Sequence, residues 1–241
     1  MAASRAQALE LIGTGGVRVE GLPQPKPSSL VDDASPIVKV APPPRYVGRG
    51  GLKLEHALDR FGIPVAGRRA LDAGASTGGF TDCLLQRGAA SVTAVDVGYG
   101  QLDRRLATDS RVTVCDRTNI RHVTTGDMGG PFDLVVGDLS FISLCTVART
   151  LAGLCTPGAD VVLLVKPQFE VGRRNVGKGG VVTDPELHAS AVSKVSGCLA
   201  EAGLAPQGVV ASPITGAKGN KEFLLWATAG GEPRAVTGVQ A

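Results

Sequence analysis

The sequence has few aromatic residues and no long apolar run. Aromatic side chains make up 4% of its 241 residues. The longest apolar stretch, around Val161–Val165, has the length of a strand and falls far short of the roughly 20 residues of a membrane helix. The first residues, Met1 to Arg5, lack the apolar core of a signal peptide. These absences argue against a pore-forming protein and predict a cytoplasmic protein with no membrane partner.

Cysteine and histidine are also scarce, and their spacing suggests no site. The five cysteines are widely spaced, no Cys-x-x-Cys pair occurs, and only three histidines accompany them. The pattern therefore predicts no metal site and no disulfide framework, but buried and reduced thiols. The cysteines are Cys83, Cys115, Cys145, Cys155 and Cys198. The net charge of +3 permits an RNA partner without requiring one.

The residues that are abundant indicate one sizeable α/β domain with a small appendage. The chain is 43% hydrophobic and contains 33 glycines. The proline-rich Ala41–Arg45 stretch divides it, because such a segment continues neither a helix nor a central strand. Before it, Ser4–Ile12 is predicted as a helix with Ser4 as N-cap, and Val17–Val19 as a strand. The predicted parts are residues 1–41, a linker at 42–48, a catalytic domain at 49–228 and a flexible tail at 229–241.

After the connector, strand patterns alternate with helical patterns. Strands are predicted at 70–72, 91–97, 112–115, 134–137, 160–165, 208–213 and 222–227, and helices at 53–61, 79–87, 143–154 and 185–202. This alternation predicts a mostly parallel, Rossmann-like α/β sheet with helices on both faces. Ligands of such sheets bind at the carboxyl ends of the strands, which is where the motifs below fall.

A glycine-rich loop is the strongest local signal. In Leu71-Asp-Ala-Gly-Ala-Ser-Thr-Gly-Gly-Phe80 a strand ends, a tight turn follows and a helix begins, whose amides favour an anionic group. The spacing differs from the Gly-x-Gly-x-x-Gly of dinucleotide sites and resembles motif I of methyltransferases, which bind S-adenosylmethionine. Asp96, after the next strand, is expected to bind the cofactor ribose, and Asp116, after the third, to face the adenine amine. The predicted cofactor site is Asp72, Gly74, Ala75, Ser76, Gly78, Gly79, Phe80, Asp96, Asp116 and Asp138.

Four ionisable residues stand where a reaction could take place. Lys53 follows Arg49-Gly-Gly51, Asp138 and Lys166 each end an apolar strand, and Glu222 precedes the last strand. A ribose hydroxyl is a poor nucleophile, so its methylation requires a base or a positioned cation beside the oxygen. We assign that role to Lys166, with Asp138 and Glu222 orienting it and Lys53 stabilising the developing alkoxide.

Other methylation chemistries fit the same residues less well. Methylation of a base amine usually requires Asp or Asn followed by Pro-Pro and an aromatic residue, whereas Asp138 is followed by Leu-Ser-Phe. Methylation of a pyrimidine carbon requires a thiolate nucleophile, but Cys145 and Cys155 fall on a predicted helix and not after a strand. Methylation of a hydroxyl oxygen is therefore the chemistry that the pattern favours.

Taken together, these motifs resemble the TlyA (hemolysin-A-like) family of bacterial rRNA 2′-O-methyltransferases, whose catalytic domain is of the FtsJ type. The resemblance runs from about Ser4 to Trp226 and implies a Lys-Asp-Lys-Glu tetrad at the four positions named above. It also implies a cytidine ribose in ribosomal RNA as the target. Its marks are Arg49–Lys53, Asp72–Phe80, Asp96–Gln101, Arg117–Asn119, Asp138–Ser143, Lys166–Glu170, Gly179–Val182 and Gly219–Glu222.

The N-terminal segment resembles an S4-type RNA-binding domain. Ser4–Ala8, Leu11–Gly21 and Lys26-Pro27 carry that likeness. The helix that the family places before Ser4 is not in this sequence, so either a truncated domain or a misassigned start codon is expected. Arg45-Tyr-Val47 is similar to the family's interdomain linker and is one residue shorter. Basic residues expected to meet RNA phosphates are Arg5, Arg18, Lys26, Arg45 and Arg49.

Three other classes of function remain open at this point. A membrane-acting hemolysin would need an amphipathic or apolar membrane segment, which the sequence lacks. A nicotinamide-dependent oxidoreductase would share the fold but not the glycine spacing. A non-catalytic ribosome-assembly factor is the strongest rival, because a truncated RNA-binding domain could bind without turnover. The intact set of four ionisable residues argues against it.

Overall fold

The computed structural model describes residues 5–13, 15–22, 25–40 and 44–234. Two compact units make up the chain, Met1–Arg45 and Tyr46–Ala241. The predicted N-cap Ser4, the first three residues of the connector at 41–43 and the end of the predicted tail at 235–241 lie outside the described residues.

In its described residues, the first unit contains one helix and a two-stranded antiparallel sheet. Helix α1 (Arg5–Gly13) and strand β1 (Val17–Val19) confirm the two elements predicted there. Strand β2 (Ile37–Lys39) pairs with β1, with Arg18 opposite Val38. The sequence analysis missed β2, because three isolated residues show no periodicity of their own.

The second unit is built on a seven-stranded sheet in the order β5-β4-β3-β6-β7-β9-β8. The first five strands in this order are parallel, and β9 runs antiparallel to both of its neighbours. The mostly parallel sheet predicted from the sequence is thereby confirmed. The strands are β3 (Arg69–Ala73), β4 (Ser91–Val95), β5 (Val112–Cys115), β6 (Phe132–Gly137), β7 (Cys155–Val165), β8 (Leu204–Ala211) and β9 (Phe223–Ala229).

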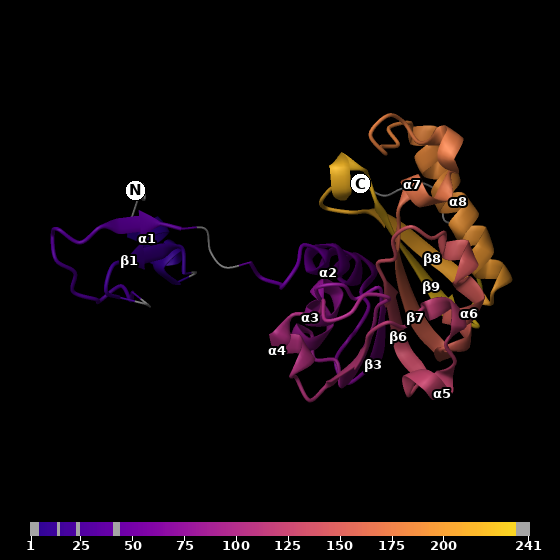
Figure 1. The fold of residues 1–241 in the computed structure, drawn as a ribbon, viewed down its shortest axis with the longest axis horizontal. Helices are drawn as coiled ribbons and strands as arrows, with labels where there is room; N and C mark the ends of the chain where they lie inside the picture. The colour runs from indigo at the N-terminus through magenta and orange to yellow at the C-terminus, as the bar shows by residue number, and fades with distance from the viewer. Residues whose placement is uncertain (1–4, 14, 23–24, 41–43, 235–241) are drawn as a thin grey trace. The chain divides into compact units, whose positions relative to one another are not determined.

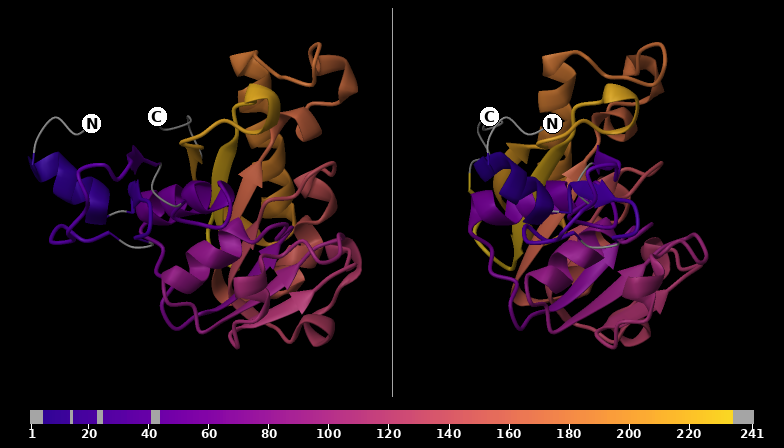
Figure 2. Two further views of the ribbon diagram at one scale, coloured as in Figure 1. Left: turned by 60° about the vertical axis from the view of Figure 1, so that its left-hand side comes forward. Right: turned by 90° about the vertical axis from the view of Figure 1, so that its left-hand side faces the viewer.

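Helices cover both faces of this sheet (Figure 1; Figure 2). Along β6, Leu134 and Val136 pack with α2, α3 and α4, whereas Val135 packs with α5, α6 and α8. Successive strand side chains point to opposite faces, so each face has its own apolar core. The helices are α2 (Gly50–Phe61), α3 (Gly79–Gln86), α4 (Arg104–Ala107), α5 (Thr125–Met128), α6 (Ala148–Gly153), α7 (Pro167–Glu170) and α8 (Pro185–Glu201), and the 3₁₀ turns are η1 (Ile120–His122), η2 (Leu144–Thr146), η3 (Arg173–Asn175) and η4 (Ala217–Gly219).

Two predicted elements differ from the structure. The helix expected over 143–154 is split into η2 and α6, because Ser143 Oγ accepts a hydrogen bond from Cys145 N and caps a separate short turn. Strand β7 begins at Cys155, five residues before its predicted start, with an irregular register opposite Phe132. Cys155 is therefore a strand residue and not a helical one.

Part of the predicted flexible tail is held to the sheet. The Arg234 amide donates a hydrogen bond to Pro206 O at 2.8 Å, and Gln207 Nε2 donates one to Glu232 O at 2.8 Å. Glu232 and Arg234 are therefore hydrogen-bonded to β8, and the flexibility of the tail stays a prediction. The signal was invisible in the sequence because both bonds use backbone atoms of the tail, whatever its side chains.

The expectation that every cysteine is a reduced thiol is wrong for two of them. Cys145 in η2 and Cys198 in α8 form a disulfide across 53 residues, with Cα atoms 5.2 Å apart. Spacing alone could not reveal it, because only the packing of η2 against α8 brings the two together. Cys83, Cys115 and Cys155 are free, and burial raises the pKa of the Cys83 thiol to about 11 and that of Cys155 to about 12.

We expect denatured protein, purified without reductant, to show three reactive thiols, and five after reduction. A Cys198→Ser variant should unfold at lower denaturant, because opening a 53-residue loop releases about 4 kcal/mol of chain entropy in the unfolded state. Thiol titration and urea unfolding measure both quantities. Five reactive thiols before reduction would contradict the disulfide, and Cys155→Ser serves as the control with an unpaired thiol.

Within the described residues, no helix of the structure combines the length and the apolarity needed to cross a bilayer.

Candidate active site

The predicted site residues gather at one edge of the sheet. Asp72 lies within β3, and Asp96, Asp138 and Lys166 follow the ends of β4, β6 and β7. These four strands are parallel, so their carboxyl ends meet at the same edge. Glu222 joins them because β9 runs the opposite way and begins where β7 ends, with Phe223 opposite Val165.

Lys166 is buried and paired. Its Nζ donates a hydrogen bond to Ser140 Oγ at 2.8 Å and lies 2.6 Å from Asp138 Oδ1, an ion pair whose angle is not that of a hydrogen bond. The strand that precedes Lys166 is apolar and buried, so its ammonium is desolvated and needs these partners. An ammonium has three donors, and Ser140 uses one, which leaves donors for a ligand oxygen.

Lys53 and Glu222 form a second buried ion pair. Lys53, in the first turn of α2, donates from Nζ to Glu222 Oε2 at 2.5 Å, and Glu222 is 3% exposed. Of the two carboxylates predicted to orient Lys166, only Asp138 contacts it directly, whereas Glu222 holds Lys53. Gly216, in the loop before β9, leaves room for the Glu222 carboxylate, because a Cβ there would lie 1.9 Å from Glu222 Oε1.

The glycine loop brings backbone close to the catalytic segment. Gly74 has a φ of +85°, and a Cβ there would lie 2.7 Å from the carbonyl oxygen of Asp138. Gly78, with a φ of +99°, starts α3, where a Cβ would lie 2.3 Å from Leu106 Cδ1. Only glycine adopts these conformations without strain, so the loop is shaped for close approach of a ligand to its backbone.

Two adjoining cavities open at this edge and share Gly74, Ser76, Asp138 and Ser140. The larger, of about 490 Å³, is also lined by Val95, Asp96, Val97, Gln101, Thr118, Asn119, Ile120, Arg121, Leu139, Phe141 and Ile142. The smaller, of about 200 Å³, is also lined by Gly48, Arg49, Gly50, Ala75, Thr77, Gly79, Phe80 and Lys166. Together they form an elongated site with a wide end beside Asp96 and a narrow end beside Lys166.

Asp72 is a buried carboxylate at the same edge of the sheet that lines neither cavity. It is fully buried; Oδ2 accepts a hydrogen bond from Thr81 Oγ1 at 2.7 Å, and Oδ1 has no hydrogen-bond partner within the described part of the chain. Burial raises the pKa of Asp72 to about 7, and the charges of Asp138 and Asp96 act in the same direction. Because the charges of Asp138 and Asp96 raise the pKa of Asp72, a positively charged ligand bound beside them would favour the ionised form of Asp72.

The two carboxylates predicted to bind the nucleoside are placed differently. Asp96 lines the wide cavity and accepts hydrogen bonds from the amides of Ser76 at 2.8 Å and Gly98 at 2.7 Å, which hold it in place with lone pairs to spare. Asp116 accepts a hydrogen bond from the Gly100 amide and does not line the cavity. The segment Thr118–Arg121 lines that end instead. The sequence analysis noted only its first two residues, as part of the motif Arg117–Asn119.

Phe141 is an exposed aromatic side chain at the rim of the wide cavity. It is 91% exposed, has a φ of +64°, and its ring centroid lies 5.2 Å from that of Phe169. An aromatic residue in the left-handed region is strained, and such strain is concentrated at functional sites. The sequence analysis did not single it out, because exposure and backbone angle are not visible in a motif.

The predicted RNA-binding residues are exposed, in both units. Arg5, Arg18, Lys26 and Arg45 belong to the first unit, and Arg49 lines the narrow cavity of the second.

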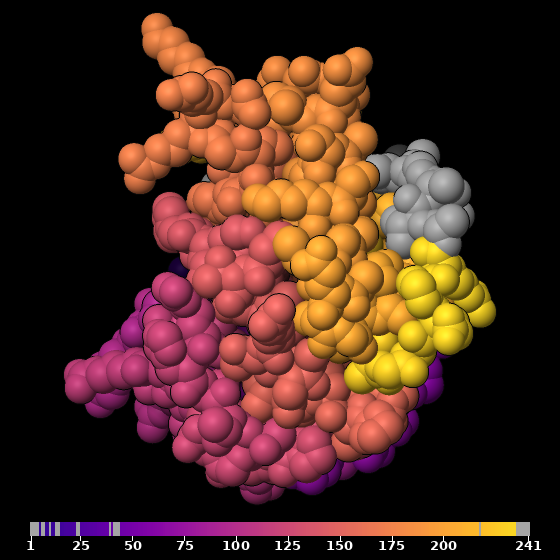
Figure 3. Space-filling model, turned by 90° about the vertical axis from the view of Figure 1, so that its right-hand side faces the viewer, coloured from indigo at the N-terminus to yellow at the C-terminus, as the bar shows by residue number. Residues whose placement is uncertain are grey.

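A further group of cations was missed. These residues lie on two loops above the sheet edge, are exposed and form no ion pair within the described ranges, and they are Arg173, Arg174, Lys178, Lys218 and Lys221. Asn220 ties the loops together, since its Oδ1 accepts a hydrogen bond from the Val182 amide and its Nδ2 donates one to Gly180 O. The first of these loops, between α7 and α8, projects from the unit (Figure 3).

No cluster of three or more potential metal ligands occurs in residues 5–13, 15–22, 25–40 or 44–234.

Comparison with known proteins bears on this site. Residues 46–229 match the family model described as FtsJ-like methyltransferase. The sequence is 55% identical, over 94% of this chain and 85% of the relative, to the 16S/23S rRNA (cytidine-2′-O)-methyltransferase TlyA of Mycobacterium tuberculosis. A solved structure from Streptococcus thermophilus has a TM-score of 0.77 at 39% identity and covers 96% of this chain and 85% of that one. An S-adenosylmethionine-dependent methyltransferase from Mesorhizobium loti, with a TM-score of 0.55 at 18% identity over 75% of this chain and all of that one, shares the fold.

Proposed function

Because the chain belongs to the FtsJ-like methyltransferase family, we propose that it transfers a methyl group from S-adenosylmethionine to the ribose 2′-hydroxyl of a cytidine in ribosomal RNA. The observation that carries this proposal is the ion pair between the buried Lys166, which lines the narrow cavity, and Asp138, which lines both cavities. The similar protein of Mycobacterium tuberculosis bears this activity in its name. A ribosomal substrate also agrees with the cytoplasmic location expected from the sequence.

The chain's residues fit S-adenosylmethionine. This cofactor supplies an electrophilic methyl group on a sulfonium cation and also carries an ammonium group. Both charges suit a site that is lined by Asp96 and Asp138, with Asp72 buried in the adjoining strand β3. The loop Gly74–Phe80 and the narrow cavity hold the methionine part, and Asp96 holds the ribose hydroxyls. We assign the adenine end to Thr118–Arg121 in place of Asp116.

The two ion pairs divide the work of activating the hydroxyl. Lys166 contacts the ribose oxygen as the base or positioned cation, with Asp138 and Ser140 fixing its Nζ. Lys53, held by Glu222, adds positive charge on the same edge and stabilises the developing alkoxide. Phe141, exposed at the rim, offers a face on which an unstacked base of the substrate packs.

The first unit is proposed to be an S4-type RNA-binding domain. Its exposed Arg5, Arg18 and Lys26 supply sequence-independent contacts to phosphates. The two cationic loops of the second unit add contacts next to the reacting ribose. The first loop begins soon after Lys166, and the second ends just before Glu222.

The cationic loops make RNA affinity dependent on salt. Replacing both Arg173 and Arg174 by glutamine should make the fall of log K with log salt less steep, by about 1.5 in slope. Each lost phosphate contact removes roughly 0.7–0.9 of that slope. Filter binding of ribosomal RNA at several salt concentrations measures it. The matched control is Arg60→Gln with Arg234→Gln, because α2 carries Arg60 away from the edge where Lys53 lies. An equal change in both variants would contradict the assignment.

Cofactor affinity should depend on Asp72. Its raised pKa means that the carboxylate is ionised only above about pH 7. Affinity for the cationic cofactor should therefore fall up to about tenfold per pH unit below that value, and Asp72→Asn should flatten the profile. The stability of the free protein changes with pH in the opposite direction to cofactor affinity. The raised pKa of Asp72 stabilises the fold at acid pH, and this contribution is lost as pH rises through about 7. Calorimetric titration of the cofactor between pH 6 and 8 tests the profile. An unchanged affinity over this range would show that Asp72 does not influence cofactor binding.

The direct test is methyl transfer from labelled S-adenosylmethionine to ribosomal RNA or subunits that lack the modification. We expect a 2′-O-methylated cytidine, identified by mass spectrometry of the digested RNA. A methylated base would contradict the proposed chemistry. Cofactor and RNA binding without transfer would support the rival reading of a non-catalytic assembly factor, and absence of cofactor binding would refute both the cofactor and the reaction.

A further inference from the structure

A buried carboxylate outside the four proposed catalytic residues joins the two segments that carry Asp138 and Lys166. Glu170, the last residue of α7, is 4% exposed. Its Oε2 accepts a hydrogen bond from Ser143 Oγ at 2.6 Å, and its Oε1 accepts one from the Leu144 amide at 2.8 Å. Ser143 and Leu144 lie at the start of η2, five and six residues after Asp138.

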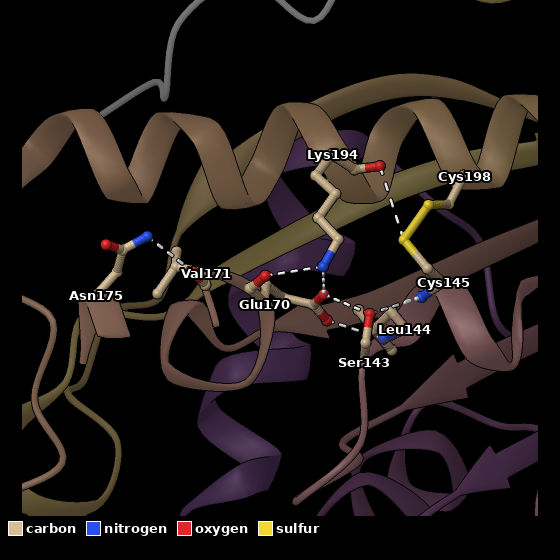
Figure 4. A network of polar contacts seen from close by, with 8 residues as sticks. All are labelled: Ser143, Leu144, Cys145, Glu170, Val171, Asn175, Lys194 and Cys198. Atoms are coloured by element: carbon tan, nitrogen blue, oxygen red, sulfur yellow. Dashed lines mark hydrogen bonds and ion pairs between the residues drawn. A yellow bond between two sulfur atoms is a disulfide. The ribbon is translucent and has the colours of Figure 1, made fainter. Parts of the chain in front are cut away.

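A third segment, α8, completes the network (Figure 4). Lys194 Nζ donates a hydrogen bond to Glu170 O at 2.8 Å and lies 3.5 Å from Oε2. One turn further along α8, Cys198 is bonded to Cys145 of η2. Helix α8 thus holds η2 through a covalent bond and α7 through a cation, and Glu170 lies between them.

The network closes a short cycle that contains the catalytic pair. From Asp138 the chain runs to Ser143, crosses to Glu170, returns to Lys166 and crosses back to Asp138 through the 2.6 Å ion pair. Phe141 and Phe169, one on each segment, make a third contact between them at 5.2 Å. Two segments joined at both ends cannot slide past each other, so the separation of Lys166 Nζ and Asp138 depends on Glu170.

We propose that Glu170 is a positioning residue, which fixes Lys166 against Asp138 through its hydrogen bonds to Ser143 and Leu144. This rests on the proposed methyl transfer, in which the direction of Nζ matters because a misplacement of about 1 Å costs on the order of 10²-fold in rate. Lys166 is positioned by the hydrogen bonds of the Glu170 carboxyl group more than by its charge. Both Glu170 oxygens accept hydrogen bonds from the start of η2, whereas the cation nearest to them, Lys194, is half exposed.

Glu170→Ala removes both hydrogen bonds. Glu170→Gln keeps the shape of the side chain, whose amide oxygen can accept a hydrogen bond from the Leu144 amide and whose amide nitrogen can donate one to Ser143 Oγ. We expect the alanine variant to lower kcat at least about tenfold with unchanged KM for cofactor and RNA, and the glutamine variant to recover most of it. The matched control is Asp160→Asn, a buried carboxylate of β7 bonded to Arg68 and Trp226 away from this edge, which should lower stability alone.

A second readout does not need turnover. The NMR chemical shift of Lys166 Nζ should change in Glu170→Ala, because a looser pair with Asp138 alters the surroundings of the ammonium, and should stay unchanged in Asp160→Asn. If the alanine variant does not fold, Ser143→Ala removes one of the same bonds. A folded Glu170→Ala variant with wild-type kcat and an unchanged Lys166 Nζ chemical shift overturns the proposal, as does a stable glutamine variant that fails to recover activity. If the wild type transfers no methyl group, the proposed function fails, and the Nζ chemical shift alone decides the role of Glu170.

Discussion

Lys166→Ala should abolish methyl transfer to RNA while leaving cofactor binding intact. The side chain supplies the base or positioned cation at the ribose oxygen, a contribution worth about 10²–10⁴-fold in rate. Cofactor affinity should persist, because the glycine loop and Asp96 form most of the cofactor's surroundings and Lys166 touches only the narrow cavity. Single-turnover transfer and calorimetric cofactor titration on the same preparation measure the two quantities.

Lys166→Arg separates the two roles left open for this residue. An arginine keeps the positive charge but does not give up its proton, so it retains part of the activity of a positioned cation and none of the activity of a base. If Lys166→Ala transfers methyl groups at the wild-type rate, the assignment of Lys166 is wrong. If Lys166→Ala also loses cofactor binding, Lys166 shapes the cofactor site, and the loss of methyl transfer cannot be assigned to the reaction step alone.

Removing one partner of the Lys53–Glu222 pair should destabilise the protein more than removing both. Glu222→Leu leaves the buried Lys53 ammonium without its partner, and the expected loss is about 3–5 kcal/mol in the free energy of unfolding. The double variant, Lys53→Met with Glu222→Leu, removes both buried charges and should recover most of that stability. It should remain inactive, because the positive charge proposed to face the alkoxide is gone.

Urea unfolding of the wild type, both single variants and the double variant gives the coupling between the two residues. Additive losses would show that the 2.5 Å contact contributes nothing to the fold. A double variant with normal methyl transfer would remove Lys53 and Glu222 from the mechanism, whatever their effect on stability. Arg68→Met with Asp160→Leu, an ion pair away from the site, is the control for stability without an effect on activity.

The sequence by itself determined the parallel sheet, the edge at which the candidate site lies and several of the ionisable residues that meet there. Asp96, Asp138 and Lys166 could be found because each follows an apolar strand, and parallel strands end at a common edge whatever the details of packing. The glycines at 74 and 78 could be found because a strand-to-helix turn with close backbone approach requires them.

Tertiary structure alone decided which of these residues contact each other. Glu222 pairs with Lys53 and not with Lys166, Thr118–Arg121 line the cavity in place of Asp116, and Cys145 meets Cys198. The physical reason is common to all three: partners up to 169 residues apart meet through the packing of helices and loops on the sheet, which follows from the fit of many side chains. A local pattern carries the type of each residue and its element, but the contact itself belongs to the folded chain.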